Sequence, residues 1–287
     1  MRRDRGDDPQ GMERTLRERA APAGSPRYYA LLFAPADVRS ALTALYAFDA
    51  EIRAAVHPAT EHAAAHLKLA WWREEIERLA RGKPLHPIGR ALLAAAEPLG
   101  LEITGLPDYL VAAEHDLSAR PIVDEDEFTG YLQRGGGLIQ QLAASFAQPS
   151  LDRRGDARRF GAALGRGLRL VEVLRSVRAD AAAGRSRLPQ SRLRASGVST
   201  AELAATAPAP QTLNLLNACA AQAQALITEA LELRLVDLPR QRAAIVLGTL
   251  GLASLQHMRR SGFTPQSSSA DGAFRLLWRA WRAARSA

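Results

Sequence analysis

The chain has 287 residues, enough for one large domain or two ordinary ones, and 47% of them are hydrophobic, so a sizeable core can form. Its single cysteine, Cys219, excludes an internal disulfide and a cysteine-rich zinc site, and is typical of a reducing compartment. The net charge of +8 comes almost wholly from arginine and suits anionic ligands, but no basic motif with interleaved aromatic residues indicates nucleic acid, and we expect none as a partner.

The N-terminal residues 1–23 are charged, contain Gly, Pro and Asp, and lack the apolar segment of a signal peptide. We therefore predict a disordered leader over residues 1–23, with Met12 as an alternative start. The longest uncharged apolar run, 243–255, is shorter than the ~18 residues that indicate a membrane span. The sequence thus favours a cytoplasmic protein, with any membrane contact peripheral to the inner membrane surface.

Helical periodicity dominates the remainder of the chain. Within 37–56, for example, Val38, Leu42, Leu45 and Ile52 recur at three- and four-residue spacing and share one helix face. No stretch alternates with a period of two, and no linker divides the chain, so we predict one all-α domain over 24–287. Helices are expected over 37–56, 61–81, 87–98, 107–119, 124–147, 154–183, 200–205, 211–234, 239–260 and 271–285.

Three features of these helices each allow two interpretations. The run 135–137 is three glycines inside a predicted helix, and it indicates either close helix packing or a helix bent around a ligand cavity. His62 and His66 lie four residues apart, a spacing that can bind zinc but that is also common on an exposed helix. Trp71 and Trp72 cannot both face the same way, so one is expected in the core and the other at a cavity or surface.

The basic amphipathic segment 274–285 contains Trp278 and Trp281 among arginines. Such a helix either lies on an anionic membrane or packs on the bundle with its arginines in water.

Two segments carry the strongest motifs. Residues 39–48 read Arg-Ser-Ala-Leu-Thr-Ala-Leu-Tyr-Ala-Phe, and 172–189 read Glu-Val-Leu-Arg-Ser-Val-Arg-Ala-Asp-Ala-Ala-Ala-Gly-Arg-Ser-Arg-Leu-Pro. They resemble the two metal-binding segments of the squalene/phytoene synthase family, and the resemblance runs from about Ser25 to the C-terminus. It implies an isoprenoid-synthase-type helical bundle around a central cavity, in which helices 37–56 and 154–183 face one another.

In that family, carboxylates four residues apart on a helix share one face and hold magnesium against a prenyl diphosphate. Here the first segment has Arg53, Ala54 and His57 in place of aspartates, and the second has Ser176. Of the family's acidic ligands only Asp180 is kept. We therefore expect no cofactor, with Mg²⁺ only if synthase activity is retained.

The resemblance also implies a set of site residues. Tyr131 and Asp180 are the remnants of the catalytic site, and Glu172 joins Asp180 as a candidate metal ligand. The apolar chamber is expected to persist, lined in part by Leu45, Tyr131 and Leu168. The ligand-binding residues implied are Ser25, Arg39, Tyr46, Arg53, Arg169, Glu172, Arg175 and Arg185.

The arginines that replace acidic residues have two alternative roles. Arg53, Arg169, Arg175 and Arg178 either bind a phosphate directly or pair with the carboxylates that fill the former metal site. For Arg53 we expect a carboxylate partner among Asp49, Glu172 and Asp180, because a buried unpaired arginine is too costly.

Residues 48–75 are also similar to a divergent branch that contains the phytoene-synthase-like assembly factor of respiratory complex I. Three functions follow from the resemblance. The first is a divergent or non-catalytic member, a pseudoenzyme that binds a prenyl diphosphate or other isoprenoid lipid. The second is an active head-to-head prenyl diphosphate transferase of isoprenoid biosynthesis. The third is an assembly or scaffold factor for a membrane complex, with a protein or membrane-surface partner.

Overall fold

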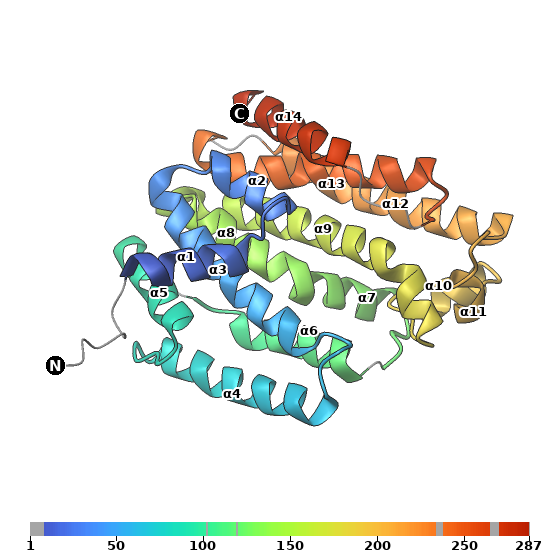
Figure 1. Cartoon of the computed structure of the whole chain (residues 1–287), viewed down its shortest axis with the longest axis horizontal. Coiled ribbons are helices and arrows are strands. Elements are labelled where there is room, and N and C mark those ends of the chain that lie inside the picture. Colours follow the sequence, from blue (N-terminus) through green and yellow to red (C-terminus); the bar gives the residue numbers. More distant parts are fainter. Residues whose placement is uncertain (1–8, 102, 119, 234–237, 265–269, 287) are drawn as a thin grey trace.

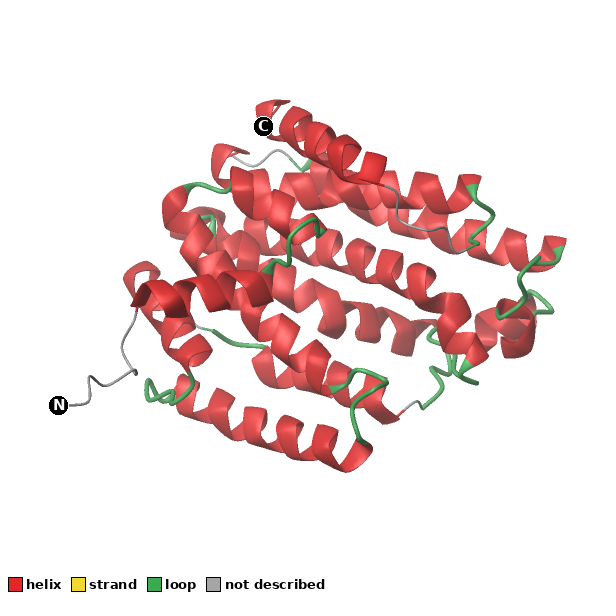
Figure 2. Ribbon diagram, viewed as in Figure 1, coloured by secondary structure: helices red, strands yellow, loops and turns green. Residues whose placement is uncertain are grey.

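Helices are the only regular elements in the part of the chain that the structure describes (Figure 2). The computed structural model describes residues 9–101, 103–118, 120–233, 238–264 and 270–286. The all-α prediction is therefore confirmed for these residues. The α-helices are α1 (Pro9–Ala20), α2 (Pro26–Phe33), α3 (Ala36–Ala55), α4 (His62–Ala80), α5 (Pro87–Ala96), α6 (Leu106–Ser118), α7 (Glu125–Leu132), α8 (Leu138–Phe146), α9 (Arg154–Ala182), α10 (Gln190–Ala195), α11 (Thr200–Leu203), α12 (Pro210–Glu232), α13 (Arg242–Arg260) and α14 (Ala270–Ser286).

The long helix α9 runs through the middle of the molecule, with α8 on one side and α12 on the other (Figure 1). Helix α3 packs on α8 and faces α9, to which the Arg53 guanidinium connects it by an ion pair with Glu172. The predicted opposition of helices 37–56 and 154–183 is therefore confirmed. Among the described residues, no helix combines the length and apolar character needed to cross a bilayer.

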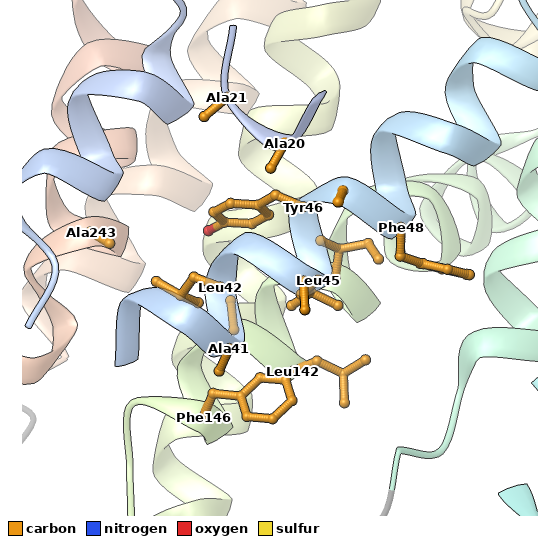
Figure 3. Close-up of a cluster of buried hydrophobic side chains, with 14 of the residues drawn as sticks. Ala20, Ala21, Ala41, Leu42, Leu45, Tyr46, Phe48, Leu142, Phe146 and Ala243 are labelled. Atoms are coloured by element: carbon orange, nitrogen blue, oxygen red, sulfur yellow. The ribbon is translucent and has the colours of Figure 1, made fainter. Parts of the chain in front are cut away.

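Two clusters of buried side chains form the core. One is centred on α3 and includes Leu42, Leu45 and Phe48 together with Phe146 of α8 (Figure 3). The other lies between α7, α9 and α12. Leu168 of α9 packs against both clusters, so it marks the zone where the two halves of the core meet.

The glycine run at 135–137 produces a local widening of the helix rather than a break. Gln133–Gly137 form one π-helical turn (η2) that joins α7 to α8, so the predicted helix 124–147 is continuous but kinked. A Cβ atom added to Gly136 would lie 2.4 Å from the carbonyl oxygen of Gly165 on α9. The glycines therefore permit close packing, and both Gly136 and Gly165 also line a cavity.

The prediction of a disordered leader over residues 1–23 is wrong for its second half. Residues 9–20 form α1, which packs on α3, with Ala20 and Ala21 in the core above Tyr46 (Figure 3). Residues 1–8 lie outside the described residues. Composition misled the prediction because the packing residues described on α1 are Leu16 and the small Ala20, which stand among charged neighbours in the sequence. The short helices α2 and α10 were also not predicted.

Two substitutions at the α8–α9 crossing test its packing. We expect Gly136→Ala or Gly165→Ala to lower the free energy of unfolding by roughly 3 kcal/mol, because each new Cβ would press on rigid backbone. Gly155→Ala, in the first turn of the same helix, has nothing within 4 Å and is the matched control. Denaturant unfolding measures all three variants; equal stability of Gly165→Ala and Gly155→Ala would contradict the packing.

Candidate ligand cavity between α3 and α9

A cavity of about 380 Å³ opens between α2, α3, α8, α9 and α13. This volume lies within the range of small-molecule sites. Its apolar wall is formed by Ile139, Leu168, Leu247 and Leu250. The rest of the lining contains five arginines and one carboxylate, Glu172, so the polar part of the cavity is cationic. These arginines are Arg19, Arg27, Arg53, Arg169 and Arg175.

Arg53 connects the two helices that carry the motif remnants. Its Nε donates to Asp49 Oδ2 on the same helix at 2.8 Å, and its Nη1 donates to Glu172 Oε2 on α9 at 2.7 Å. The expectation that Arg53 has a carboxylate partner is confirmed, with Asp49 and Glu172 as the two partners. Burial alone raises the pKa of Glu172, but the guanidiniums of Arg53 and Arg169 outweigh it and hold that pKa below its ordinary value.

Asp49 is the most deeply buried carboxylate of this group, with no exposed surface. It also accepts hydrogen bonds from the Arg27 guanidinium of α2 and the Tyr109 hydroxyl of α6. Burial raises the pKa of the Asp49 carboxyl, whereas Arg27 and Arg53 together hold it far below its usual range. Asp49 is therefore charged and fully bonded, and it joins three helices.

A second set of bonds surrounds Arg169 on the next part of α9. Its Nη2 donates to Asp116 of α6 and, at 2.6 Å, to the hydroxyl of Tyr131. Its Nη1 donates to Glu172 at 3.1 Å, which joins this set to Arg53. Tyr131 in turn donates to Asp116 Oδ1 at 2.7 Å, and burial raises the pKa of its phenol. Tyr131 is thus a hydrogen-bonded member of an ion-pair cluster.

Asp180, the retained acidic residue, lies at the far end of the same network. Its Oδ2 accepts from Ser176 Oγ at 2.7 Å and from the Arg187 guanidinium, and Arg185 Nη2 lies 3.5 Å from Oδ1. Arg187 also donates to Asp116 at 2.9 Å. A continuous chain of charges therefore runs from Arg27 through Asp49, Arg53, Glu172, Arg169, Asp116 and Arg187 to Asp180.

The residues present do not fit a magnesium site. A hard divalent cation needs several carboxylate or water oxygens with few competing cations nearby. Here Asp49, Glu172 and Asp180 each contact at least two arginines, or an arginine and a hydroxyl, and Arg53 lies between the first two. No group of three metal-ligating side chains occurs within the described ranges.

The residues predicted to bind ligand separate into two groups. Five of them line the cavity, and three do not. The lining residues are Ser25, Arg53, Arg169, Glu172 and Arg175. Arg39 donates instead to the Ala34 carbonyl at 2.8 Å, Tyr46 is fully buried in the core, and Arg185 lies beside Asp180.

Of the three residues expected to line the apolar chamber, only Leu168 does so. Leu45 and Tyr131 are buried in the core clusters, and the Tyr131 hydroxyl is bonded to Arg169 and Asp116.

Sequence reasoning missed Arg27, Tyr109, Asp116 and Arg187. Asp116 and Tyr109 lie on α6, outside both motif segments, and only the tertiary fold brings them to Arg169 and Asp49. Arg187 lies within the motif segment 172–189, and its guanidinium pairs with Asp116 and Asp180.

Three further features that the sequence analysis singled out have simpler explanations. His62 and His66 are exposed, and their Nε2 atoms lie 3.0 Å apart without a third ligand among the described residues. Trp72 is buried whereas Trp71 is 40% exposed, as expected for adjacent positions on α4. Arg178 lies on the α11 side and contacts Thr206, away from the cavity.

Removal of Arg169 tests the network. We expect Arg169→Met to lower the free energy of unfolding by about 3–5 kcal/mol, because it leaves the largely buried Asp116 and the half-buried Glu172 with fewer partners. Arg159→Met, which breaks the exposed pair with Asp156, should cost less than about 1 kcal/mol. Urea unfolding compares the two; a similar small cost at both positions would show that the network does not stabilise the fold.

The network also makes stability depend on acid pH. Burial raises the pKa of Asp116, but Arg169 and Arg187 outweigh it and lower that pKa from 3.8 to about 2. The unfolded chain therefore binds more protons between these values, so the stability from Asp116, about 2 kcal/mol, is present above pH 4 and lost toward pH 2. Unfolding measured from pH 5 to pH 2 should show this loss in the wild type and a shallower slope in Asp116→Asn; parallel slopes would contradict it.

Comparison with known proteins supports the helical fold described above. The family model described as squalene/phytoene synthase matches residues 20–282. A phytoene synthase of Thermus thermophilus is 29% identical over 195 residues, which cover 68% of this chain and 65% of that protein. The bifunctional protein CrtB/UppS of Streptomyces coelicolor is 27% identical over 46% of this chain and 23% of its own length. The chain thus aligns with less than two thirds of either relative.

Solved structures share the fold at low identity. A dehydrosqualene synthase in complex with ligand superposes with a TM-score of 0.82 and 19% identity, covering 97% of this chain and 98% of the other. The squalene synthase HpnC of Alicyclobacillus acidocaldarius superposes with a TM-score of 0.75 and 21% identity, covering 90% and 96%. Since the family model spans nearly the whole described chain, this protein belongs to the squalene/phytoene synthase family.

Proposed function

We propose that this protein binds an isoprenoid ligand with an anionic head group in the α3–α9 cavity, through arginine and without magnesium. It does not release diphosphate at the rate of a synthase. The observation that carries the proposal is the Arg53 bridge, which joins Asp49 to Glu172 where the family places its metal-holding carboxylates. The protein is then a divergent, non-catalytic member of its family.

The shape of the cavity supports an amphiphilic ligand. Leu168, Leu247 and Leu250 offer an apolar wall, and the charged part of the lining consists of five arginines and the carboxylate of Glu172. Prenyl chains need mostly apolar walls, and phosphate groups are matched by the planar donors of guanidinium.

Among the lining arginines, Arg175 is the best placed to take a new anion. It is exposed on α9, and its described hydrogen bond is to the hydroxyl of Ser254 at 3.1 Å, with no described carboxylate within ion-pair distance. Arg53 and Arg169, by contrast, are held by carboxylates. The hydroxyl of Ser25 caps α2 by accepting from Tyr28 N, so Ser25 orders the chain at the cavity edge.

Binding is tested with farnesyl thiodiphosphate, which resists cleavage. We expect calorimetric affinity to be the same with magnesium and with EDTA, and to fall by about tenfold or more, 1.4 kcal/mol, in Arg175→Gln. Ala50→Trp should fill the cavity edge and abolish binding, whereas Ala70→Trp, on the exposed surface of α4, should bind as the wild type. Binding that needs magnesium, or that Ala50→Trp leaves intact, would overturn the proposal.

Turnover is tested separately with farnesyl diphosphate and magnesium. We expect diphosphate release far below ~1 per second, an ordinary enzyme rate. The variant Arg53→Asp/His57→Asp/Ser176→Asp returns the family's carboxylates and removes the Arg53 bridge. Diphosphate release by this variant would show that the rest of the site can still support the synthase reaction. Release by the unmodified protein at ordinary rates would establish the alternative, an active prenyl transferase.

A scaffold role for a membrane complex, suggested by the resemblance to the assembly-factor branch, stays a prediction. Unlike the proposed ligand-binding role, a scaffold role requires no amphiphilic ligand in the cavity. Absence of farnesyl thiodiphosphate binding, with a folded protein, would favour it.

A further inference from the structure

The C-terminal helix α14 packs in an unusual way. It lies at the outer edge of the bundle against α13 and α2 (Figure 1). Its described inner face combines the buried Ala280, Ala283 and Ala284 with the partly buried Leu276. Three other large apolar residues of the helix are exposed: Leu277 is 40%, Trp278 48% and Trp281 44% exposed. A surface helix normally buries its largest apolar residues, so this exposed face has no partner among the described residues that would account for it.

Positive charge surrounds the same face. Residues 242–260 and 275–286 contain no aspartate or glutamate. An open groove of about 890 Å³ between α13 and α14 is lined by Arg259, Arg260, Arg279 and Arg282 together with Trp278. The guanidinium of Arg282 lies 4.8 Å from the Trp278 ring centre, and that of Arg285 lies 4.8 Å from Trp281.

Helix α4 provides a contrast within the same molecule. It also exposes an apolar pair, Leu67 and Trp71, but it carries the exposed Glu74 and Glu77 beside its basic residues. A surface of mixed sign has no preference for an anionic partner, whereas the charged side chains of residues 242–260 and 275–286 are all positive. Exposed tryptophan together with arginine is the composition of segments that lie at the boundary between lipid head groups and acyl chains.

We propose that the α13–α14 surface, defined by Leu277, Trp278, Trp281 and the groove arginines, docks onto an anionic phospholipid bilayer. The tryptophans and Leu277 enter the head-group region, and the arginines pair with lipid phosphates. The helix lies in the plane of the interface, since no described helix is long and apolar enough to span the bilayer. This places the protein on a membrane surface whether or not the α3–α9 cavity holds a ligand.

The test is co-sedimentation of the full chain with vesicles of phosphatidylcholine alone and of phosphatidylcholine with phosphatidylglycerol. We expect binding only to the anionic vesicles, falling as salt rises. Trp278→Ala/Trp281→Ala should weaken binding by roughly tenfold or more, and Arg279→Glu/Arg282→Glu should remove the preference for phosphatidylglycerol.

Matched controls lie on α4, at the opposite edge of the molecule (Figure 1). Trp71→Ala removes an equally exposed tryptophan, and Lys68→Glu/Arg81→Glu makes the same change of charge; both should bind anionic vesicles as the wild type. Circular dichroism of each variant shows that the helices are kept.

Four outcomes would overturn the proposal. The first is equal binding to neutral and anionic vesicles. The second is an equal loss of binding in the α4 and α14 variants. The third is a dimer in sedimentation velocity that Trp278→Ala/Trp281→Ala dissociates while the wild type ignores vesicles, which would make the face an interface between two copies. Inorganic phosphate at millimolar concentration should not compete with vesicles, and displacement by it would indicate a simple anion site instead.

Discussion

The ion pair between Arg53 and Glu172 is the interaction on which the site depends. It crosses from α3 to α9, and through Asp49 and Arg169 it connects carboxylates and guanidiniums from α2, α6 and the segment after α9. Burying these charges is costly, so each must keep its partners. The network consequently fixes how the helices around the cavity are spaced, in addition to setting the charge of the cavity.

The ion pair between Arg53 and Glu172 also changes the chemistry that the site between α3 and α9 can perform. A carboxylate that already bonds two guanidiniums has little capacity left for a cation, and the nearby positive charges repel one. The positive charge that magnesium would supply is instead built into the protein. Fixed arginines can bind an anionic head group, but they lack the focused charge of a metal that polarises a leaving group. Recognition without turnover is the function that we propose for this arrangement.

The helices that carry the site could be predicted from the sequence, but only some of the ion pairs and hydrogen bonds within it could. Helix periodicity and the motif segments placed α3 and α9. The rule that a buried arginine needs a partner led to Asp49, Glu172 and Asp180 as candidates for Arg53, and the first two pair with it. Asp116 could not be predicted, because its contact with Arg169 spans more than fifty residues and carries no local pattern. Tyr131 was placed in the chamber by resemblance, but its hydroxyl bonds to Arg169 and to Asp116, which also pairs with Arg187. Helix α1 was missed because the packing residues described on it, Leu16 and Ala20, stand among charged neighbours in the sequence.

A crystal structure of the protein grown with Mn²⁺ and farnesyl thiodiphosphate, with anomalous scattering from manganese, tests the central claim most directly. Manganese takes the oxygen ligands that magnesium prefers. The account predicts no anomalous peak between α3 and α9, with Arg53 still bonded to Asp49 and Glu172 and the diphosphate beside Arg175. Manganese bound between Asp49 and Glu172, with Arg53 displaced into solvent, would contradict it.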